Sequence, residues 1–143
     1  MTESSNHFSV RRYTDADYFA VRDNLEAAGM YDPTSQSREN LRFMSEDSRY
    51  AVLVAATDDE VVGNVIATPY GKSVSIIWGF VVAERCRRQG VGAKLMKAVE
   101  AEFGIGEIWG FIKSREYDAK AFYENQGYRL DKTTDFTAFW KEI

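Results

Sequence analysis

One stretch of the sequence combines glycines and arginines in a way that suits anion binding. The segment VVAERCRRQGVGAKL starts at Val81 and places Arg85, Arg87 and Arg88 ahead of Gly90 and Gly92. A helix that begins at these glycines presents free N–H groups and the positive end of its dipole. Glycine leaves the backbone open to a phosphate, and arginines add charge-assisted hydrogen bonds. The pattern indicates a phosphate site or, alternatively, a glycine-rich helix start with a solvated arginine face.

Two common nucleotide-binding motifs do not match this stretch. The Walker pattern GxxxxGK[ST] fails because the residues from Gly90 to Leu95 lack its spacing and its hydroxyl. The dinucleotide pattern GxGxxG fails because Leu95 stands in place of the third glycine. The motifs alone therefore leave the phosphate ligand open.

The same residues resemble a known family signature. The run from Arg87 to Gly92 fits the Q/R-x-x-G-x-G/A signature of the GNAT superfamily of acyl-CoA-dependent N-acetyltransferases. A second block, from Ala119 to Tyr128, is similar to the family's A-x-x-[LF]-Y-E-x-x-G-F pattern. The order of elements also agrees with the family from Phe8 to the end, so the resemblance covers nearly the whole chain.

The resemblance implies acetyl-CoA as the cosubstrate and no metal. Arg87 and Arg88 would flank the CoA phosphates, and the adjoining strand would pair with the pantetheine arm as if it were another strand. The backbone amides that would cradle the pyrophosphate belong to Gln89, Gly90, Val91, Gly92 and Ala93. The strand residues that would pair with pantetheine are Phe80, Val81 and Val82.

The resemblance also implies a mechanism in which an amine attacks the thioester directly in a ternary complex. Tyr123 occupies the position that often serves as general acid in the family, and a phenol can protonate a departing thiolate. A backbone N–H near Val81 or Val82 would bind the oxyanion. The strand from Ser73 to Val82 contains no carboxylate and no histidine, so the general base stays unassigned. The unranked candidates are Glu116, Glu107, Glu60 and Asp32.

The acceptor is expected to bind at the segment GMYDPTSQS, between the first two helices. Its Tyr31 and Asp32 are the candidate contacts to an amine, and a net charge of -4 modestly favours a cation. Trp78 and Trp109 are candidates to wall the acceptor, with ordinary core packing as the alternative.

The sequence departs from the family pattern at three places. Glu84 stands where proline is common, and Cys86 stands where an aromatic residue is common. Glu116 replaces an asparagine that precedes the last helix in many members, which puts one CoA contact in doubt.

Length, charge and composition limit the domain number, the partners and the location that we expect for this protein. The 143 residues fit a single domain, with residues 1–7 as a flexible tail. The negative net charge argues against a nucleic-acid partner. Cys86 is the one cysteine and His7 the one histidine, which excludes an internal disulfide and a zinc-type cluster. The chain has no signal-peptide pattern and no apolar run of the ~20 residues that a membrane span needs. We expect a cytoplasmic protein and leave a homodimer open.

Alternating and helical periodicities predict a mixed sheet with helices on both faces. The fold class is α/β of the mixed α+β kind, mostly antiparallel, with a central parallel pair splayed to bind acyl-CoA as in the GNAT family. The predicted strands are 8–12, 50–57, 60–70, 74–82, 107–112, 128–130 and 136–142. The predicted helices start at a Thr14 cap and end at Gly29, start at Ser35 or Ser37, and cover about 90–103 and 118–126.

The tetrapeptide Ile-Trp-Gly-Phe occurs twice, ending at Phe80 and at Phe111. The flanking residues differ, which argues against duplication, and both copies fall on the predicted parallel pair. Alternation places Trp78 and Phe80 on one face and makes the tryptophans neighbours if the strands pair nearly in register. Gly79 and Gly110 would allow a bulge or a close approach.

These observations favour an N-acetyltransferase, a transferase that acetylates a primary amine of a small molecule. A protein N-terminal or lysine acetyltransferase is the alternative within enzymes. A non-catalytic acyl-CoA sensor is the alternative outside them.

Overall fold

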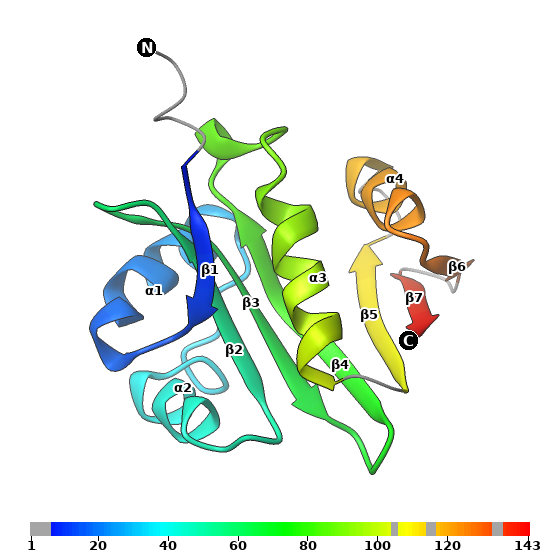
Figure 1. Ribbon diagram of the computed structural model, residues 1–143, viewed down its shortest axis with the longest axis horizontal. Helices are drawn as coiled ribbons and strands as arrows, with labels where there is room; N and C mark the ends of the chain where they lie inside the picture. Colours follow the sequence, from blue (N-terminus) through cyan, green and yellow to red (C-terminus); the bar gives the residue numbers. More distant parts are fainter. Residues whose placement is uncertain (1–6, 104–105, 114–116, 133–135) are drawn as a thin grey trace.

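The computed structural model describes residues 7–103, 106–113, 117–132 and 136–143. Within them the strands form one seven-stranded sheet in the order β1-β2-β3-β4-β5-β7-β6 (Figure 1). The strands are β1 Ser9–Arg12, β2 Ala51–Ala56, β3 Val61–Pro69, β4 Val74–Val82, β5 Glu107–Lys113, β6 Arg129–Lys132 and β7 Phe136–Glu142. Each lies within two residues of its predicted range, and the predicted fold class is confirmed.

Two polar caps start the helices of the N-terminal half. Thr14 forms a capping box with Asp17 ahead of a short 3-10 helix, which continues as α1, Tyr18–Ala27. Ser37 caps α2, Arg38–Ser45, where its hydroxyl accepts the Asn40 N–H at 3.1 Å. Of the two predicted starts of this helix, Ser35 and Ser37, the structure has Ser37 as the N-cap.

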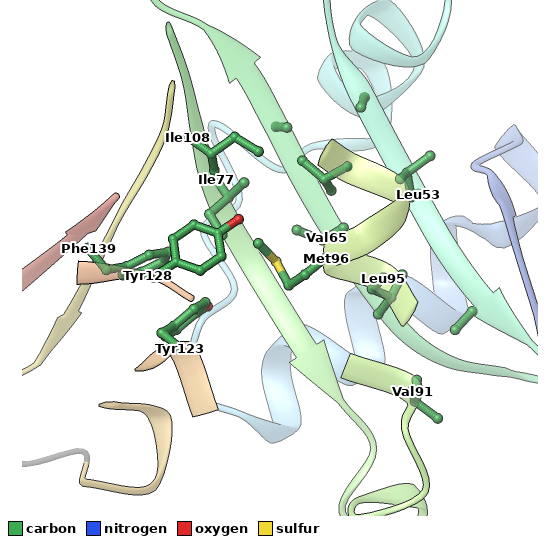
Figure 2. Packing of buried hydrophobic residues seen from close by; sticks show 14 of the residues in the cluster. Leu53, Val65, Ile77, Val91, Leu95, Met96, Ile108, Tyr123, Tyr128 and Phe139 are labelled. Carbon is green, nitrogen blue, oxygen red and sulfur yellow. The ribbon is translucent and has the colours of Figure 1, made fainter. Parts of the chain in front are cut away.

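The helices cover opposite faces of the sheet and create two apolar clusters. The helix α3, Val91–Phe103, and the helix α4, Tyr117–Asn125, pack on one face, where Leu95 and Met96 lie against Leu53 and Val65 (Figure 2). The helices α1 and α2 pack on the other face. The prediction of helices on both faces is thus confirmed, and α3 connects β4 to β5.

Only the first part of β4 pairs with β5. The two strands are parallel, and their pairs run from Val74 with Glu107 to Ile76 with Trp109. Beyond Ile76 the strands have no further pairing with each other and diverge toward their C-terminal ends (Figure 1). The predicted splayed pair is present, and its opening lies beside the start of α3.

A bulge in β4 changes which face its side chains occupy. Asn64 pairs with Val81 and Ile66 with Trp78, so Gly79 and Phe80 both lie opposite Val65. Gly79 has a φ of +59°, a conformation that favours glycine.

The extra residue shifts the alternation between the two faces. Trp78 packs with the α1 and α2 cluster, whereas Phe80 packs with the α3 cluster. The prediction that Trp78 and Phe80 share a face was therefore wrong, because simple alternation does not anticipate a bulge.

Candidate active site

The start of α3 has the open backbone that an anion site needs. Gly90 has a φ of +83°, and a Cβ placed on it would meet no atom within 4 Å. The Lys94 N–H donates to the Gly90 carbonyl at 3.1 Å, so the helix begins directly after Gly90. Since the first N–H groups of a helix have no partner inside it, those of Val91 to Ala93 are suited to an external acceptor.

The arginines of the loop before α3 differ in the groups that they contact. Arg85 forms an ion pair with Glu60 of the β2–β3 turn. Arg87 folds back toward the end of β4, where its Nε donates to the Val82 carbonyl at 3.2 Å. Arg88 has a φ of 66°, which makes a tight turn into Gln89 and Gly90. Arg87 and Arg88 therefore stand beside the helix start, while Arg85 is drawn toward the neighbouring hairpin.

Gly92 lets the first turn of α3 contact aromatic rings from two other elements. A Cβ at Gly92 would lie 3.2 Å from ring atoms of both Phe80 and Phe122. Those two rings stack with their centroids 5.4 Å apart. The end of β4, the start of α3 and the helix α4 thus meet at one place.

Tyr123 lies at this same junction (Figure 2). Its side chain is 4% exposed, and its ring stacks on Phe139 of β7 with the centroids 3.7 Å apart. Phe80 is its neighbour on the β4 side, at 5.9 Å. Gly110 makes room for Phe139, because a Cβ at Gly110 would overlap the Phe139 ring.

The segment between α1 and α2 reaches the β4 bulge through a buried glutamine. Gln36 is 3% exposed, and its Oε1 accepts the Asp32 N–H at 2.6 Å. Its Nε2 lies 3.5 Å from the place that a Cβ on Gly79 would take. Tyr31 shares a hydrogen bond of 3.0 Å with the hydroxyl of Tyr18.

Asp32 is held by its own loop. The Ser35 hydroxyl is the largest cause that lowers the pKa of Asp32, followed by the backbone N–H groups of Ser35 and Thr34. This carboxylate stays ionised and is a weak base.

The two tryptophans lie on one face but are not level with each other. Trp109 pairs with Ile76, two residues before Trp78. The two tryptophans, predicted to be neighbours if the strands paired nearly in register, are therefore offset by two residues. Trp109 donates from Nε1 to Glu107 Oε1 at 3.0 Å. Trp78 and Tyr31 each pack against the apolar cluster under α1 and α2. Tyr31 and Trp78 thus border the same apolar cluster, and Trp109 lies on the neighbouring strand.

The match to a family model decides the relationship. Residues 48–130 match the model described as the acetyltransferase (GNAT) domain. The chain belongs to the GNAT family of acetyltransferases. Members of this family use acetyl-CoA, and the GNAT fold supports acyl-CoA-dependent acetyl transfer.

Solved GNAT structures share this fold at low sequence identity. An acetyltransferase of the GNAT family from Staphylococcus aureus Mu50 has a TM-score of 0.83 and 16% identity, over 95% of this chain and 99% of that one. The PaiA N-acetyltransferase from Thermoplasma acidophilum, in complex with coenzyme A, has a TM-score of 0.81 and 16% identity, over 96% of this chain and 99% of that one. Ard1 from Thermoplasma volcanium has a TM-score of 0.81 and 20% identity, over 95% of this chain and 97% of that one. No curated protein sequence matches the chain.

The base candidates that the structure describes lie on three separate segments of this GNAT domain. Glu60 is paired with Arg85, and Glu107 begins β5 opposite Val74, at the end of the strands away from the opening. Glu116 lies outside the described residues. Asp32 has the lowered pKa described above. Among the described residues, Glu60, Glu107 and Asp32 form no common acidic group.

Sequence reasoning overlooked two polar residues at the bulge of this GNAT domain, Asn64 and Gln36. Asn64 is completely buried on β3, and its Nδ2 donates to the Gly79 carbonyl at 2.8 Å. An asparagine inside the apolar run VVGNVIAT was the available signal, because asparagine is depleted in strands and rarely buried. Gln36 had no such signal, since polar residues are ordinary in loops.

In the part of the chain that the structure describes, no helix combines the length and apolar character of a membrane span. The described His, Cys, Asp and Glu side chains form no group of three that could hold a metal ion.

Proposed function

We propose that this GNAT domain transfers the acetyl group of acetyl-CoA to a primary amine of a small molecule, by direct attack in a ternary complex. The observation that carries the proposal is the early end of the β4–β5 pairing at Ile76 and Trp109, beside the glycine-rich start of α3. This arrangement leaves an unpaired strand edge and unpaired helix N–H groups at the same end of the sheet.

The proposed acetyl-CoA site uses both features. The amides from Gln89 to Ala93 would hold the pyrophosphate, and the open space at Gly90 fits a phosphate close to the backbone. Arg87 and Arg88 would add charge beside it. Backbone groups of Phe80, Val81 and Val82 would pair with the pantetheine arm, as an added strand pairs with a sheet edge.

The proposed chemistry needs a hydrogen-bond donor to the oxyanion and a general acid for the leaving thiolate. The amine nitrogen attacks the thioester carbonyl, the C–S bond breaks, and the sulfur leaves as a thiolate. A β4 backbone N–H at the bulge would bind the carbonyl oxygen as negative charge develops on it. Tyr123 would protonate the thiolate, and its buried place between Phe80 and Phe139 supports that role by fixing its ring. Water would carry the ammonium proton away, since β4 supplies no carboxylate or histidine.

The acceptor would enter from the α1 and α2 face. Tyr31 and Trp78 both border the apolar cluster on that face, and Asp32 remains anionic at neutral pH, which favours a cationic amine. Trp109 would extend the apolar wall from the neighbouring strand. The close approach of Gln36 to Gly79 supports a short path from this face to the bulge.

The test combines binding with turnover. Acetyl-CoA is titrated while the melting temperature is followed, and free thiol release is then measured with a panel of amines, amino acids and peptides. We expect stabilisation by acetyl-CoA and thiol release with small amines. Failure of acetyl-CoA to stabilise the protein would refute the cosubstrate assignment. Release with peptides alone would redirect the proposal to a protein substrate.

A non-catalytic acyl-CoA sensor is the second candidate, because the strand from Ser73 to Val82 lacks a carboxylate and a histidine. Stabilisation by acetyl-CoA without thiol release across the whole panel would favour the sensor. Thiol release with any amine would exclude it.

A matched pair of glycine variants tests the phosphate site. Gly90 and Gly71 have φ values of +83° and +78°, and neither has an atom within 4 Å of an added Cβ. Gly90→Val and Gly71→Val should therefore each lose about 1–2 kcal/mol of stability through the same backbone strain. Only Gly90→Val should lose stabilisation by acetyl-CoA, because its side chain would occupy the phosphate position. Equal stabilisation of both variants would contradict this site.

A further inference from the structure

At the β4 bulge, the Gly79 carbonyl falls outside the regular pairing of β4 with β3. Gly79 is missing from the register between β3 and β4, so its carbonyl lacks the usual cross-strand N–H. A buried carbonyl without a donor is costly. The Asn64 side chain replaces that donor, at 2.8 Å from Nδ2 to the Gly79 oxygen.

The orientation of the Asn64 carboxamide is itself held by α1. Asn24 donates from Nδ2 to Asn64 Oδ1 at 3.3 Å and lies 3.4 Å from the Val61 carbonyl. Because the Asn64 oxygen is already an acceptor for Asn24, its NH2 group faces Gly79. The chain of contacts runs from α1 through β3 to the bulge in β4.

Fixing the Gly79 carbonyl also fixes the next N–H. The carbonyl of Gly79 and the N–H of Phe80 belong to one planar peptide unit, and the described peptide bonds are not cis. In a trans peptide these two groups point in opposite directions, so the Phe80 N–H points away from Asn64 and from β3. On that other side of β4 the neighbouring strand is β5, whose pairing has already ended at Ile76.

We propose that Asn64 is a positioning residue, which holds the Gly79–Phe80 peptide so that the Phe80 N–H faces the opening between β4 and β5. The role rests on the proposed function, since the acyl oxygen is the group that this N–H would meet. It also selects Phe80 as the oxyanion donor, in place of the expected Val81 or Val82. A hydrogen-bond donor displaced by about 1 Å can reduce a rate by about 100-fold. The hydrogen bond from Asn64 to the Gly79 carbonyl, which fixes this peptide, therefore matters for turnover.

The first experiment separates turnover from binding. Asn64→Leu keeps the approximate volume of the side chain and removes the donor, and Asn64→Ala is the second variant if the first does not fold. We expect kcat to fall about 10-fold to 100-fold, while the affinity for CoA without an acyl group stays within about twofold. Val62→Ala is the control for a general loss of packing, because Val62 is also buried on β3 but belongs to the α3 cluster. Its kcat should change less than about twofold.

The second experiment observes the peptide directly by NMR of ¹⁵N-labelled protein. In the wild type, acetyl-CoA should move the Phe80 amide proton further downfield than CoA does, because only acetyl-CoA brings an acyl oxygen to it. Asn64→Leu should lose this difference, and Val62→Ala should keep it. An unchanged kcat and an unchanged Phe80 response in the Asn64 variants would overturn the proposal, as would an equal loss of kcat in Val62→Ala.

The ligand-free spectra keep this inference distinct from the proposed function. If wild-type protein turned over no amine or bound no acetyl-CoA, the proposed function would fail. The Gly79 and Phe80 resonances of the free protein should still differ between wild type and Asn64→Leu, and stay unchanged in Val62→Ala. Identical free-protein resonances in the Asn64 variant would overturn the positioning role by themselves.

Discussion

The two copies of Ile-Trp-Gly-Phe have the same four residues and different structures. In the β4 copy, Gly79 has a φ of +59° and begins a bulge, so the tryptophan and phenylalanine around it face opposite sides of the sheet. In the β5 copy, Gly110 pairs regularly with Phe139, without a register shift. The first glycine supplies an unusual backbone conformation, and the second supplies space.

The difference comes from the neighbouring strands. β4 lies beside β3, where Asn64 provides a hydrogen bond to the Gly79 carbonyl. β5 lies beside β7, where the Phe139 ring covers Gly110 and supports Tyr123. The same local sequence therefore shapes one side of the opening through its backbone and the other side through aromatic packing.

The largest effect should come from filling the space at Gly110. Gly110→Val places its side chain inside the Phe139 ring position, and overpacking of this kind costs about 3 kcal/mol at the upper end of its usual range. Urea denaturation should show the loss. With Phe139→Ala added, the total cost should be less than the sum of the two single losses, because the two positions are coupled. A Gly110→Val protein of wild-type stability would show that Gly110 does not serve as space.

A smaller effect should follow from removing the hydroxyl that the β5 side supports. Tyr123→Phe keeps the stack on Phe139 and removes the proposed acid, so kcat should fall about 100-fold, at the low end for general acid–base catalysis. Steady-state kinetics should show KM for acetyl-CoA nearly unchanged. Phe122→Leu is the control, since Phe122 neighbours Tyr123 and carries no hydroxyl. Wild-type kcat in Tyr123→Phe would remove Tyr123 as the acid.

The smallest loss of stability should come from Gly79→Ala. A side chain in the left-handed region costs about 1–2 kcal/mol, and the new Cβ would lie 3.1 Å from Ile66 Cδ1. Thermal melts should therefore show a smaller change than in Gly110→Val, with CoA binding retained. If Gly79→Ala destabilised the protein more than Gly110→Val, the contrast between a conformational glycine and a spatial glycine would be wrong.

Most elements were predictable because their signals are local. Thr14 and Asp17 marked a capping box, and the steps of four from Val91 to Phe103 marked α3. The parallel pair followed from a strand, a helix and a strand in succession. The bulge was not predictable, because it belongs to the pairing of β4 with β3, where the Gly79 carbonyl meets Asn64, 15 residues away along the chain. The two-residue offset of the tryptophans likewise depends on the register between distant strands.

The sequence by itself determined the family signatures, the glycine-rich helix start and the order of strands and helices. These features depend on residues close together in the chain, where caps, periodicity and backbone freedom act. Only the tertiary structure decided that Asn64 holds the Gly79 carbonyl, that Phe139 fills the space at Gly110, and that Trp78 and Phe80 face apart. These features depend on contacts between strands, and the free energy of such a contact depends on the partner that folding brings alongside.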